Sequence, residues 1–453
     1  MSVGTAMPAT ERLGQVRFAV ADELTCYYDR PDEPANVHLE ARVPARLDEA
    51  GVRAAVRAVL EGEPELRTRQ SATSRWRPAF YWEYLAGVDV DPVATASFAD
   101  EDELADLRSA LLSQSPSLRT CPPLRFLLAT GPGGDALILN AHHARIDGLS
   151  CLRLLRQVAE HYTVLARGGD PPEPPGVGAP CGAAFPPRSV AALPRSSVQA
   201  TPRSDGITPI VKIAPEPEAG PSSDRSGYGT RHVTWDGLEE AASLRAAGAS
   251  VNDLLIAAMM MTIAGWNESH GRKRGLIKIT MPVGDPAQAG AGGLWANTSR
   301  LTSVTARIEA GLAAADLLAD VAAQTRYAKE HSGPQVDFFC RVLAASPVPV
   351  AVKDRLLRTA ITLAGSVVCD TCLVSNLGVI EPVTFGAVTA SQLWFSTFAH
   401  MPRGLSLGAL TVAGRLQLTF RYRPALFSEP AAAAFARRYV QVLDRITGRE
   451  AAS

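Results

Sequence analysis

The sequence has 453 residues, of which 46% are hydrophobic and 20% charged, which excludes a fully disordered chain and is enough for two hydrophobic cores. Lys and Arg number 45 against 46 for Asp and Glu, so no net positive charge indicates binding to nucleic acid or to an anionic membrane. The first residues contain no basic region followed by an apolar segment, which predicts a cytoplasmic protein without a secretory signal. The longest apolar run, 254–266, is too short to span a bilayer, so we expect no membrane span.

The first part of the chain alternates amphipathic helical patterns with short apolar runs. The spacing of Val52, Val56 and Val59, with Asp48 ahead of them as a cap, is typical of an amphipathic helix. Short apolar runs bounded by Pro and Gly are typical of buried strands. The elements predicted here are a helix over 47–60, a helix around 100–112, and adjacent strands at 122–129 and 136–141.

Between 168 and 229 the composition shifts to Pro, Gly, Ser and Ala, which cannot build a core. We interpret this stretch as a linker between an N-terminal lobe, 1–167, and a C-terminal lobe, 230–453. An apolar helix over 251–266, capped by Ser250, is predicted early in the second lobe. The other elements predicted there are strands at 232–235, 276–282, 372–375, 405–412 and 416–422, a helix around 313–330, and a last helix opened by Ser428 and ended by Gly448.

The seven cysteines are odd in number and scattered, which indicates free thiols rather than a disulfide framework. Cys369 and Cys372 form the one CxxC pair, whereas zinc needs about four ligands. We interpret these two cysteines as small core residues of a strand over 366–375 and predict no metal site.

The most informative segment begins where the strand at 136–141 runs into His142 and His143. A short loop then reaches Asp147 and Gly148, and an amphipathic helix follows. A neutral imidazole, with an unperturbed pKa of about 6.5, can accept a proton from an attacking hydroxyl or amine near neutral pH. Asp147 can order the loop by ion pairing or by accepting backbone N–H bonds, and Gly148 lets the chain turn into the helix. A core histidine and a simple helix cap are the alternative interpretations of His143 and Asp147.

The segment from His142 to Gly148, HHARIDG, resembles the HHxxxDG motif of a large acyltransferase superfamily. The superfamily includes nonribosomal-peptide condensation domains, chloramphenicol acetyltransferase, wax-ester synthases and polyketide-associated acyltransferases. Further segments resemble family motifs in the family's order along the chain. These segments are GEPELRTRQ at 62–70, PPLRFLLA at 122–129, ASVNDLLIAA at 249–258, GGLWANTSRL at 292–301 and VSNLGVI at 374–380.

This resemblance implies an α/β fold of two chloramphenicol-acetyltransferase-like lobes in a V arrangement, with a substrate tunnel between them. It implies that His143 is the general base or a substrate-positioning residue and that His142 is a packing neighbour. Asp147 and Gly148 would support the site structurally. Ser375 and Asn376, from the opposite lobe, would line the tunnel or polarise the thioester carbonyl, or else serve as hydrogen-bonding residues of a strand.

Two positions depart from the pattern of condensation domains. Those domains usually place an Arg upstream of the NT loop, paired with the motif Asp, where this chain offers Asp285. Arg300 or Arg145 could replace that Arg, or backbone amides alone could hold Asp147. The second departure is LWFSTFAHMPRG in place of a DFGWG-type segment, as in stand-alone members of the superfamily. Its His400 is interpreted as a surface histidine in preference to a tunnel residue.

The predicted function is that of an acyltransferase in bacterial natural-product biosynthesis. It would condense a thioester-activated acyl group with a hydroxyl or amine of a small-molecule acceptor, forming an ester or an amide. The donor would be a phosphopantetheine thioester, on an acyl or peptidyl carrier protein in trans or on coenzyme A, and no bound cofactor or metal is expected. The protein is expected to be a monomer.

Other functions are left open by the sequence. The same fold could serve as a non-catalytic recruitment module, or could catalyse cyclisation or dehydration of a tethered intermediate. The basic turn at 271–275 could dock an acidic carrier protein or be a solvated loop. We find no GxSxG, GxxxxGK(S/T) or HExxH motif and no GxGxxG after a strand, so hydrolase, nucleotidase, zinc-protease and dinucleotide-binding functions lack their characteristic residues.

Overall fold

The computed structural model describes most of the chain. The described residues are 11–72, 75–169, 210–217, 226–246, 248–283, 295, 300–309, 311–330 and 346–449. The segment GGLWANTSRL is therefore described only at Trp295 and in its last two residues, and parts of the predicted linker, 170–209 and 218–225, lie outside the description.

The first part of the chain forms strands and helices at the positions that the sequence predicts, together with several more. In chain order these are β1 (Arg12–Arg17), α1 (Val20–Tyr28), β2 (Asn36–Val43), α2 (Glu49–Gly62), β3 (Thr68–Gln70), β4 (Tyr81–Leu85), β5 (Val93–Ser97), α3 (Glu101–Leu112), β6 (Leu124–Gly131), β7 (Gly134–His142) and α4 (Gly148–Ala166). The predicted helices at 47–60 and around 100–112 correspond to α2 and α3, and the predicted strands to β6 and β7.

The second part also contains the predicted elements together with several more. Its elements are β8 (Gly229–Trp235), α5 (Leu238–Ala246), α6 (Val251–Ser269), β9 (Leu276–Val283), β10 (Arg300–Arg307), α8 (Ala314–Glu330), α10 (Val350–Val368), β11 (Cys372–Ile380), β12 (Thr384–Phe385), β13 (Val388–Thr389), β14 (Gln392–Thr397), β15 (Leu405–Val412), β16 (Arg415–Tyr422) and α11 (Glu429–Thr447). The predicted strand over 366–375 is wrong in its first residues, because the chain is still helical in α10 up to Val368.

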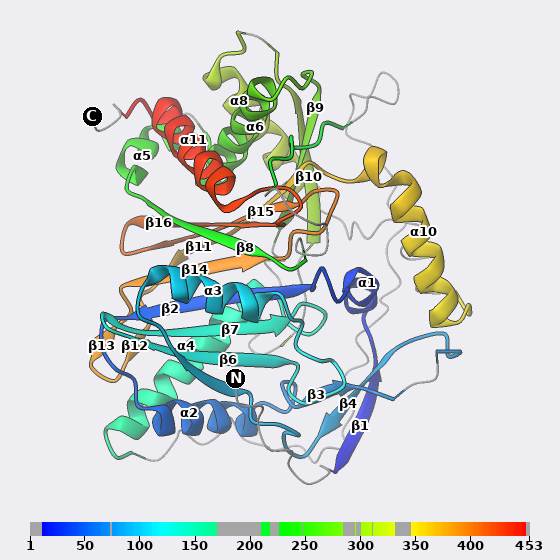
Figure 1. The fold of residues 1–453 in the computed structure, drawn as a ribbon, viewed down its shortest axis with the longest axis vertical. Helices are drawn as coiled ribbons and strands as arrows, with labels where there is room; N and C mark the ends of the chain where they lie inside the picture. The colour runs from blue at the N-terminus through cyan, green and yellow to red at the C-terminus, as the bar shows by residue number, and fades with distance from the viewer. Residues whose placement is uncertain are drawn as a thin grey trace.

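Two large sheets carry the fold, as Figure 1 shows. One has five strands in the order β14-β2-β7-β6-β5, and the other has six in the order β10-β9-β11-β15-β16-β8. Helices α2 and α4 lie below the five-stranded sheet in the view, whereas α5, α6, α8 and α11 lie above the six-stranded sheet. This arrangement confirms the predicted α/β class.

Alternation along the strands explains why helices pack on both faces of the five-stranded sheet. Phe126 and Leu128 of β6 join the core under α2 and α4, while Leu127 and Ala129 point to the other face and pack with Leu104 of α3. Successive side chains of a strand point to opposite faces, so a strand that is apolar throughout must be covered on both sides. The segment from Leu124 to Ala129, apart from the exposed Arg125, is therefore a strand buried between two layers of helix.

Strand β14 belongs to the five-stranded sheet although it comes late in the chain. It pairs antiparallel with β2, with Thr397 opposite Val37 and Gln392 opposite Arg42. The chain then returns to the six-stranded sheet through β15, which lies against β14. The division into lobes 1–167 and 230–453 with a linker at 168–229 stays a prediction, and the sequence did not predict this exchange of a strand.

Local capping interactions account for the correctly predicted helix ends. Asp48, Ser250 and Ser428 each accept a hydrogen bond from a backbone N–H in the first turn of the helix that follows. Gly448 ends α11 in the left-handed conformation, with φ of 72°, which glycine adopts readily.

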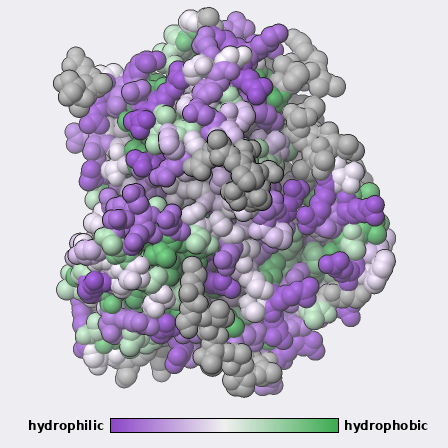
Figure 2. Space-filling model, viewed as in Figure 1, coloured by the Kyte–Doolittle hydropathy of each residue, from purple (hydrophilic) through white to green (hydrophobic). Residues whose placement is uncertain are grey.

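Apolar side chains are largely gathered in the interior. The face shown in Figure 2 is mostly hydrophilic, with smaller hydrophobic areas between the polar residues. Within the described parts of the chain, no helix combines the length and the apolar character needed to cross a membrane. The same residues contain no group of three or more His, Cys, Asp or Glu side chains placed to bind a metal ion.

Candidate functional site

His143 lies directly after β7, in the loop that leads from this strand to α4. Its backbone N–H donates to the carbonyl oxygen of Ala35 at 2.9 Å, and its half-buried ring stands edge-on to Phe398, with centroids 5.4 Å apart. Burial lowers the pKa of the imidazole, while the nearby Asp147 carboxylate acts in the opposite direction. The ring is therefore neutral near pH 7, the state in which it can accept a proton.

His142 points to the opposite side and is buried. Its Nδ1 accepts a hydrogen bond from the backbone N–H of Ala144 at 3.1 Å, so the proton of a neutral ring resides on Nε2. That Nε2 lies 3.4 Å from Oδ2 of Asp29. Burial acts to raise the pKa of Asp29, but the hydrogen bond and charge interaction with His142 and the amide of Ala35 outweigh it, so the pKa is lowered.

Asp147 and Gly148 shape the start of α4. Oδ1 of Asp147 accepts a hydrogen bond from the N–H of Ser150 at 2.9 Å, which is the geometry of a helix N-cap. A Cβ on Gly148 would lie 2.7 Å from the ring of Phe395 and 3.0 Å from Leu377. Gly148 has no left-handed φ, so glycine is needed here for close packing rather than for the turn that the sequence suggested.

Arg145 is fully engaged in structural contacts. Its guanidinium donates to the carbonyl oxygen of Glu65 at 2.9 Å, to Oγ1 of Thr68 at 2.9 Å and to the carbonyl oxygen of Trp295 at 2.6 Å. Arg145 thus connects the loop of the HHARIDG segment to the turn that contains Glu65 and Thr68. The side chain of Arg300, the other arginine suggested as a partner of Asp147, lies outside the described residues, as does Asp285, which stands where condensation domains usually have an Arg.

Ser375 and Asn376 lie on β11 in the other sheet. Ser375 is buried opposite Gly408 of β15, and Oδ1 of Asn376 accepts a hydrogen bond from the N–H of Gly378 at 2.9 Å. This bond closes a bulge in which Leu377 reaches the start of α4 next to Gly148. The segment therefore meets the motif helix through Leu377, and the roles of Ser375 and Asn376 at the reacting atoms stay predictions.

The prediction for His400 is wrong. Instead of lying at the surface, the residue is 7% exposed and packs against Phe398, with ring centroids 4.5 Å apart. Burial, assisted by the positive charge of Arg403, lowers its pKa to about 3. Phe398 also contacts His143, so its ring touches the rings of both histidines. The apolar residues around His400 in LWFSTFAHM were the available signal for burial.

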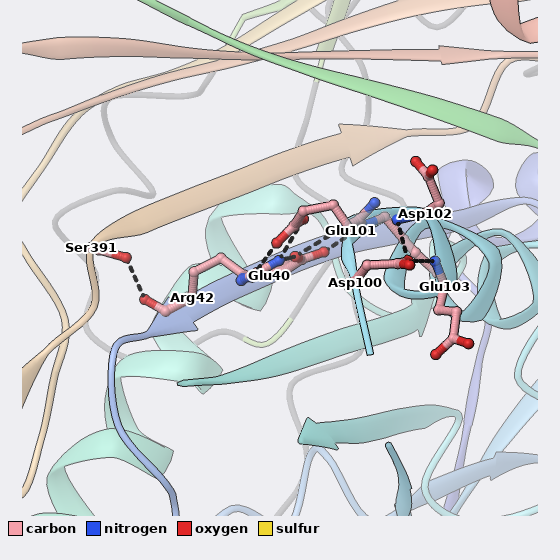
Figure 3. Close-up of polar contacts among 8 residues, drawn as sticks. Glu40, Arg42, Asp100, Glu101, Asp102, Glu103 and Ser391 are labelled. Carbon is pink, nitrogen blue, oxygen red and sulfur yellow. Dashed lines mark hydrogen bonds and ion pairs between the residues drawn. The ribbon is translucent and has the colours of Figure 1, made fainter. Parts of the chain in front are cut away.

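A second buried polar group lies in the five-stranded sheet, as Figure 3 shows around Glu40. Arg108 of α3 donates two hydrogen bonds to the Glu40 carboxylate, at 2.6 and 2.9 Å, and Nε2 of His38 is 3.4 Å away. Burial acts to raise the pKa of Glu40, but the Arg108 charge outweighs it and holds the pKa well below its usual value. Toward the surface, Arg42 pairs with Glu101. This group fastens α3 to β2.

Comparison with known proteins places the fold. No protein-family model matches the chain. Two uncharacterized proteins of Mycobacterium tuberculosis, MT2362 of strain CDC 1551 / Oshkosh and Rv2305 of strain ATCC 25618 / H37Rv, are each 27% identical over 419 residues, which is 90% of this chain and 94% of each relative.

Comparison with solved structures shows which fold this chain has. The first condensation domain of the calcium-dependent antibiotic synthetase, in complex with a substrate analogue, matches with a TM-score of 0.67 and 15% identity over 97% of this chain and 98% of that one. A variant of the starter condensation domain of rhizomide synthetase RzmA, in complex with C8-CoA, matches with a TM-score of 0.63 and 13% identity over 96% and 95%. This chain has the condensation-domain fold.

The condensation-domain fold confirms, at the level of structure, the resemblance carried by the HHARIDG segment. The same fold is found in the epimerization domain from the third module of tyrocidine synthetase B, which matches with a TM-score of 0.58 and 15% identity over 98% of this chain and 99% of that one. A fold that hosts several reactions does not fix one of them, so the function has to be argued from the site.

Proposed function

We propose that this protein is an acyltransferase that condenses a thioester-activated acyl group with a hydroxyl or an amine to form an ester or an amide. The observation that carries the proposal is His143: a neutral, half-buried imidazole at a strand end, held by the Ala35 carbonyl and by Phe398. The condensation-domain fold supports it, since one matching structure is a complex with C8-CoA and another with C8-CoA and Leu-SNAC.

In the proposed reaction, the imidazole of His143 accepts the proton of the acceptor's hydroxyl or amine as its oxygen or nitrogen attacks the thioester carbonyl carbon. The new C–O or C–N bond forms, and the tetrahedral intermediate then expels the thiolate as the C–S bond breaks. The thiolate takes the proton back from the imidazolium. A base that starts neutral and ends neutral suits a site from which water is largely excluded.

The donor is proposed to be a phosphopantetheine thioester, carried by an acyl or peptidyl carrier protein in trans or by coenzyme A. The acceptor is a small molecule, and the setting is natural-product biosynthesis. Ser375 and Asn376 are proposed to line the substrate tunnel or to polarise the thioester carbonyl, a contribution that can reach about 3 kcal/mol for one well-placed donor. The protein is proposed to act as a monomer.

The test is a product assay by mass spectrometry with wild type and His143→Ala. Each is incubated with acyl-CoAs and acyl-loaded carrier proteins, together with alcohol and amine acceptors. We expect wild type to form an ester or amide from at least one pair. The His143→Ala variant is expected to lose about 10²- to 10⁴-fold in kcat on that pair, because general base catalysis contributes about that factor.

His161→Ala is the matched control. His161 lies near the far end of α4, some 20 Å along the helix from Gly148 at about 1.5 Å per residue, so its removal should leave the rate unchanged. Full activity of folded His143→Ala on a productive pair would show that His143 is not the base. A wild type that binds a loaded carrier protein without turnover would favour the recruitment module, and loss of water from a tethered substrate would favour cyclisation or dehydration.

A further inference from the structure

The carboxylate of Asp29 lies against one histidine of the motif, His142, and is linked to the other, His143, through Ala35. Asp29 follows α1 and is far from the motif in sequence. Its Oδ2 lies 3.4 Å from Nε2 of His142, and its Oδ1 accepts a hydrogen bond from the N–H of Ala35 at 2.8 Å. The carbonyl of the same Ala35 accepts the N–H of His143 at 2.9 Å.

We propose that Asp29 is a positioning residue for the catalytic histidine, an inference that rests on the proposed function. One carboxylate oxygen lies against the ring of His142, and the other accepts the N–H of Ala35, the residue whose carbonyl oxygen accepts the N–H of His143. The two contacts together set the direction in which the His143 ring leaves the end of β7. A small displacement of a reacting group costs about 10²-fold in rate, so this direction matters to turnover.

The tautomer of His142 follows from the same geometry. Its Nδ1 accepts the N–H of Ala144 at 3.1 Å, so the proton of the ring is on Nε2, the nitrogen that lies 3.4 Å from Asp29. A carboxylate has an acceptor for each of its two neighbours, the ring N–H and the Ala35 N–H. An amide in the same place has one oxygen and one NH₂ group, so one neighbour would face a donor instead of an acceptor.

The loop that follows Asp29 is held from the other sheet. Oε1 of Glu33 accepts the N–H of Met401 at 3.0 Å and lies 3.4 Å from Nε of Arg423, while Nη1 of Arg421 donates to the carbonyl of Asn36 at 3.3 Å. Asp29 therefore sits in a loop that is fixed by these contacts, and through it the two histidines are held relative to that loop. No local sequence pattern reveals this arrangement, because the contacts join residues far apart in the chain.

The experiment compares wild type with Asp29→Asn, with Asp32→Asn as the matched control. Asp32 lies three residues further along the same loop, and its side chain is exposed. With a productive donor and acceptor pair, Asp29→Asn is expected to lower kcat about ten- to a hundredfold with little change in KM, since substrate binding surfaces are kept while the base is misdirected. Asp32→Asn should leave both constants unchanged.

A second readout does not need turnover. Long-range ¹H–¹⁵N spectra of protein labelled at histidine should show His142 with a proton on Nε2 and none on Nδ1 in wild type and in Asp32→Asn, and a changed His142 signal in Asp29→Asn. Assignment comes from His142→Gln. If wild type turns over no pair, the proposed function fails, while these spectra still test whether Asp29 positions His142. A wild-type His142 protonated on Nδ1, spectra that Asp29→Asn leaves unchanged, or a folded Asp29→Asn with wild-type kcat would each overturn the proposal.

Discussion

At the scale of single residues, Arg145 illustrates a motif position whose role is structural. Its guanidinium is fully buried and donates to two carbonyls and a hydroxyl, from Glu65, Trp295 and Thr68. Lysine would keep the charge but replace the planar fork by a single ammonium, which cannot reach all three acceptors. We therefore predict that Arg145→Lys lowers the free energy of unfolding by about 2 to 3 kcal/mol, measured by urea denaturation.

The control for that prediction is Arg125→Lys. Arg125 is an exposed arginine of β6, so its replacement by lysine should change the free energy of unfolding by less than about 0.5 kcal/mol. If Arg145→Lys proves as stable as Arg125→Lys, the three hydrogen bonds of Arg145 do not hold the motif loop.

Residue identities in the site were predictable only where they lie close together in sequence. His143, Asp147 and Gly148 stand in one short segment, and the sequence placed them at a strand end and a helix start, as the structure shows. Asp29 and Phe398 reach the same place from distant parts of the chain. Their partners are decided by strand pairing between β2, β7 and β14, which no local pattern encodes.

At the scale of elements, α4 depends on its cap. Oδ1 of Asp147 accepts the N–H of Ser150, and an asparagine oxygen can do the same. We predict that Asp147→Asn unfolds with nearly the free energy of wild type, whereas Asp147→Ala loses about 1 kcal/mol, as Asp48→Ala should on α2. Chemical denaturation of the three variants measures this. Equal losses in Asp147→Asn and Asp147→Ala would show that the charge, not the cap, stabilises the loop.

The charge of Asp147 has a separate consequence for the base. This carboxylate acts to raise the pKa of His143, against the larger effect of burial. Asp147→Asn removes that charge while keeping the cap, so the pKa of His143 should fall further. We predict that the acid limb of the kcat/KM profile against pH moves to lower pH in Asp147→Asn. A limb that stays in place would mean that another group titrates there.

The helices that were predicted could be recognised for a physical reason. The caps at Asp48, Ser250 and Ser428 act within one turn, so the residues that begin each helix are also the residues that reveal it. Strand β14 satisfies its backbone only by pairing with β2, hundreds of residues earlier in the chain, and its membership of that sheet had no local signal. The same holds for the short sheet of β1, β4 and β3.

At the scale of the whole molecule, the two large sheets meet across buried rings and charges. His232 of β8 stacks on Trp394 of β14, with centroids 4.4 Å apart and an angle of 14° between the rings. Within the five-stranded sheet, Nδ1 of His38 on β2 lies 3.1 Å from Oγ of Ser396 on β14. Strand β14 therefore pairs with the five-stranded sheet, and it contacts the six-stranded sheet by ring packing and by a hydrogen bond of 2.7 Å from Oγ of Ser406 to the carbonyl oxygen of Thr397.

We predict that the buried histidines between the two sheets, His38 and His232, make the free energy of unfolding fall in mild acid. Burial lowers the pKa of His38 and, with the charge of Arg108, lowers that of His232 well below 6.5. In the folded protein these rings stay neutral as the pH falls, whereas in the unfolded chain they take up protons near pH 6.5. The unfolded state then binds more protons, so the free energy of unfolding falls as the pH drops below about 6.5.

The expected size of the effect is up to about 1.4 kcal/mol per pH unit for each such histidine. Glu40 contributes at lower pH, because its lowered pKa makes its stabilisation disappear only as the pH falls below about 4.5. Measurements between pH 6.5 and 5 therefore report mainly on histidines. His232→Phe keeps a flat ring against Trp394 and removes the titrating group, so its stability should fall less steeply with decreasing pH than that of wild type.

Urea denaturation at pH 7.5, 6.5, 5.5 and 5.0 measures how the free energy of unfolding changes with pH in wild type and in His232→Phe. Near pH 7.5 the free energies of unfolding of wild type and His232→Phe should change in parallel with pH, because the ring is neutral in both states of the wild type there. The difference between them should begin to grow near pH 6.5, where the unfolded chain takes up protons, and increase as the pH falls. Parallel curves down to pH 5 would mean that His232 is protonated in the folded protein, and that the seam between the two sheets admits a charge that its burial beside Arg108 should exclude.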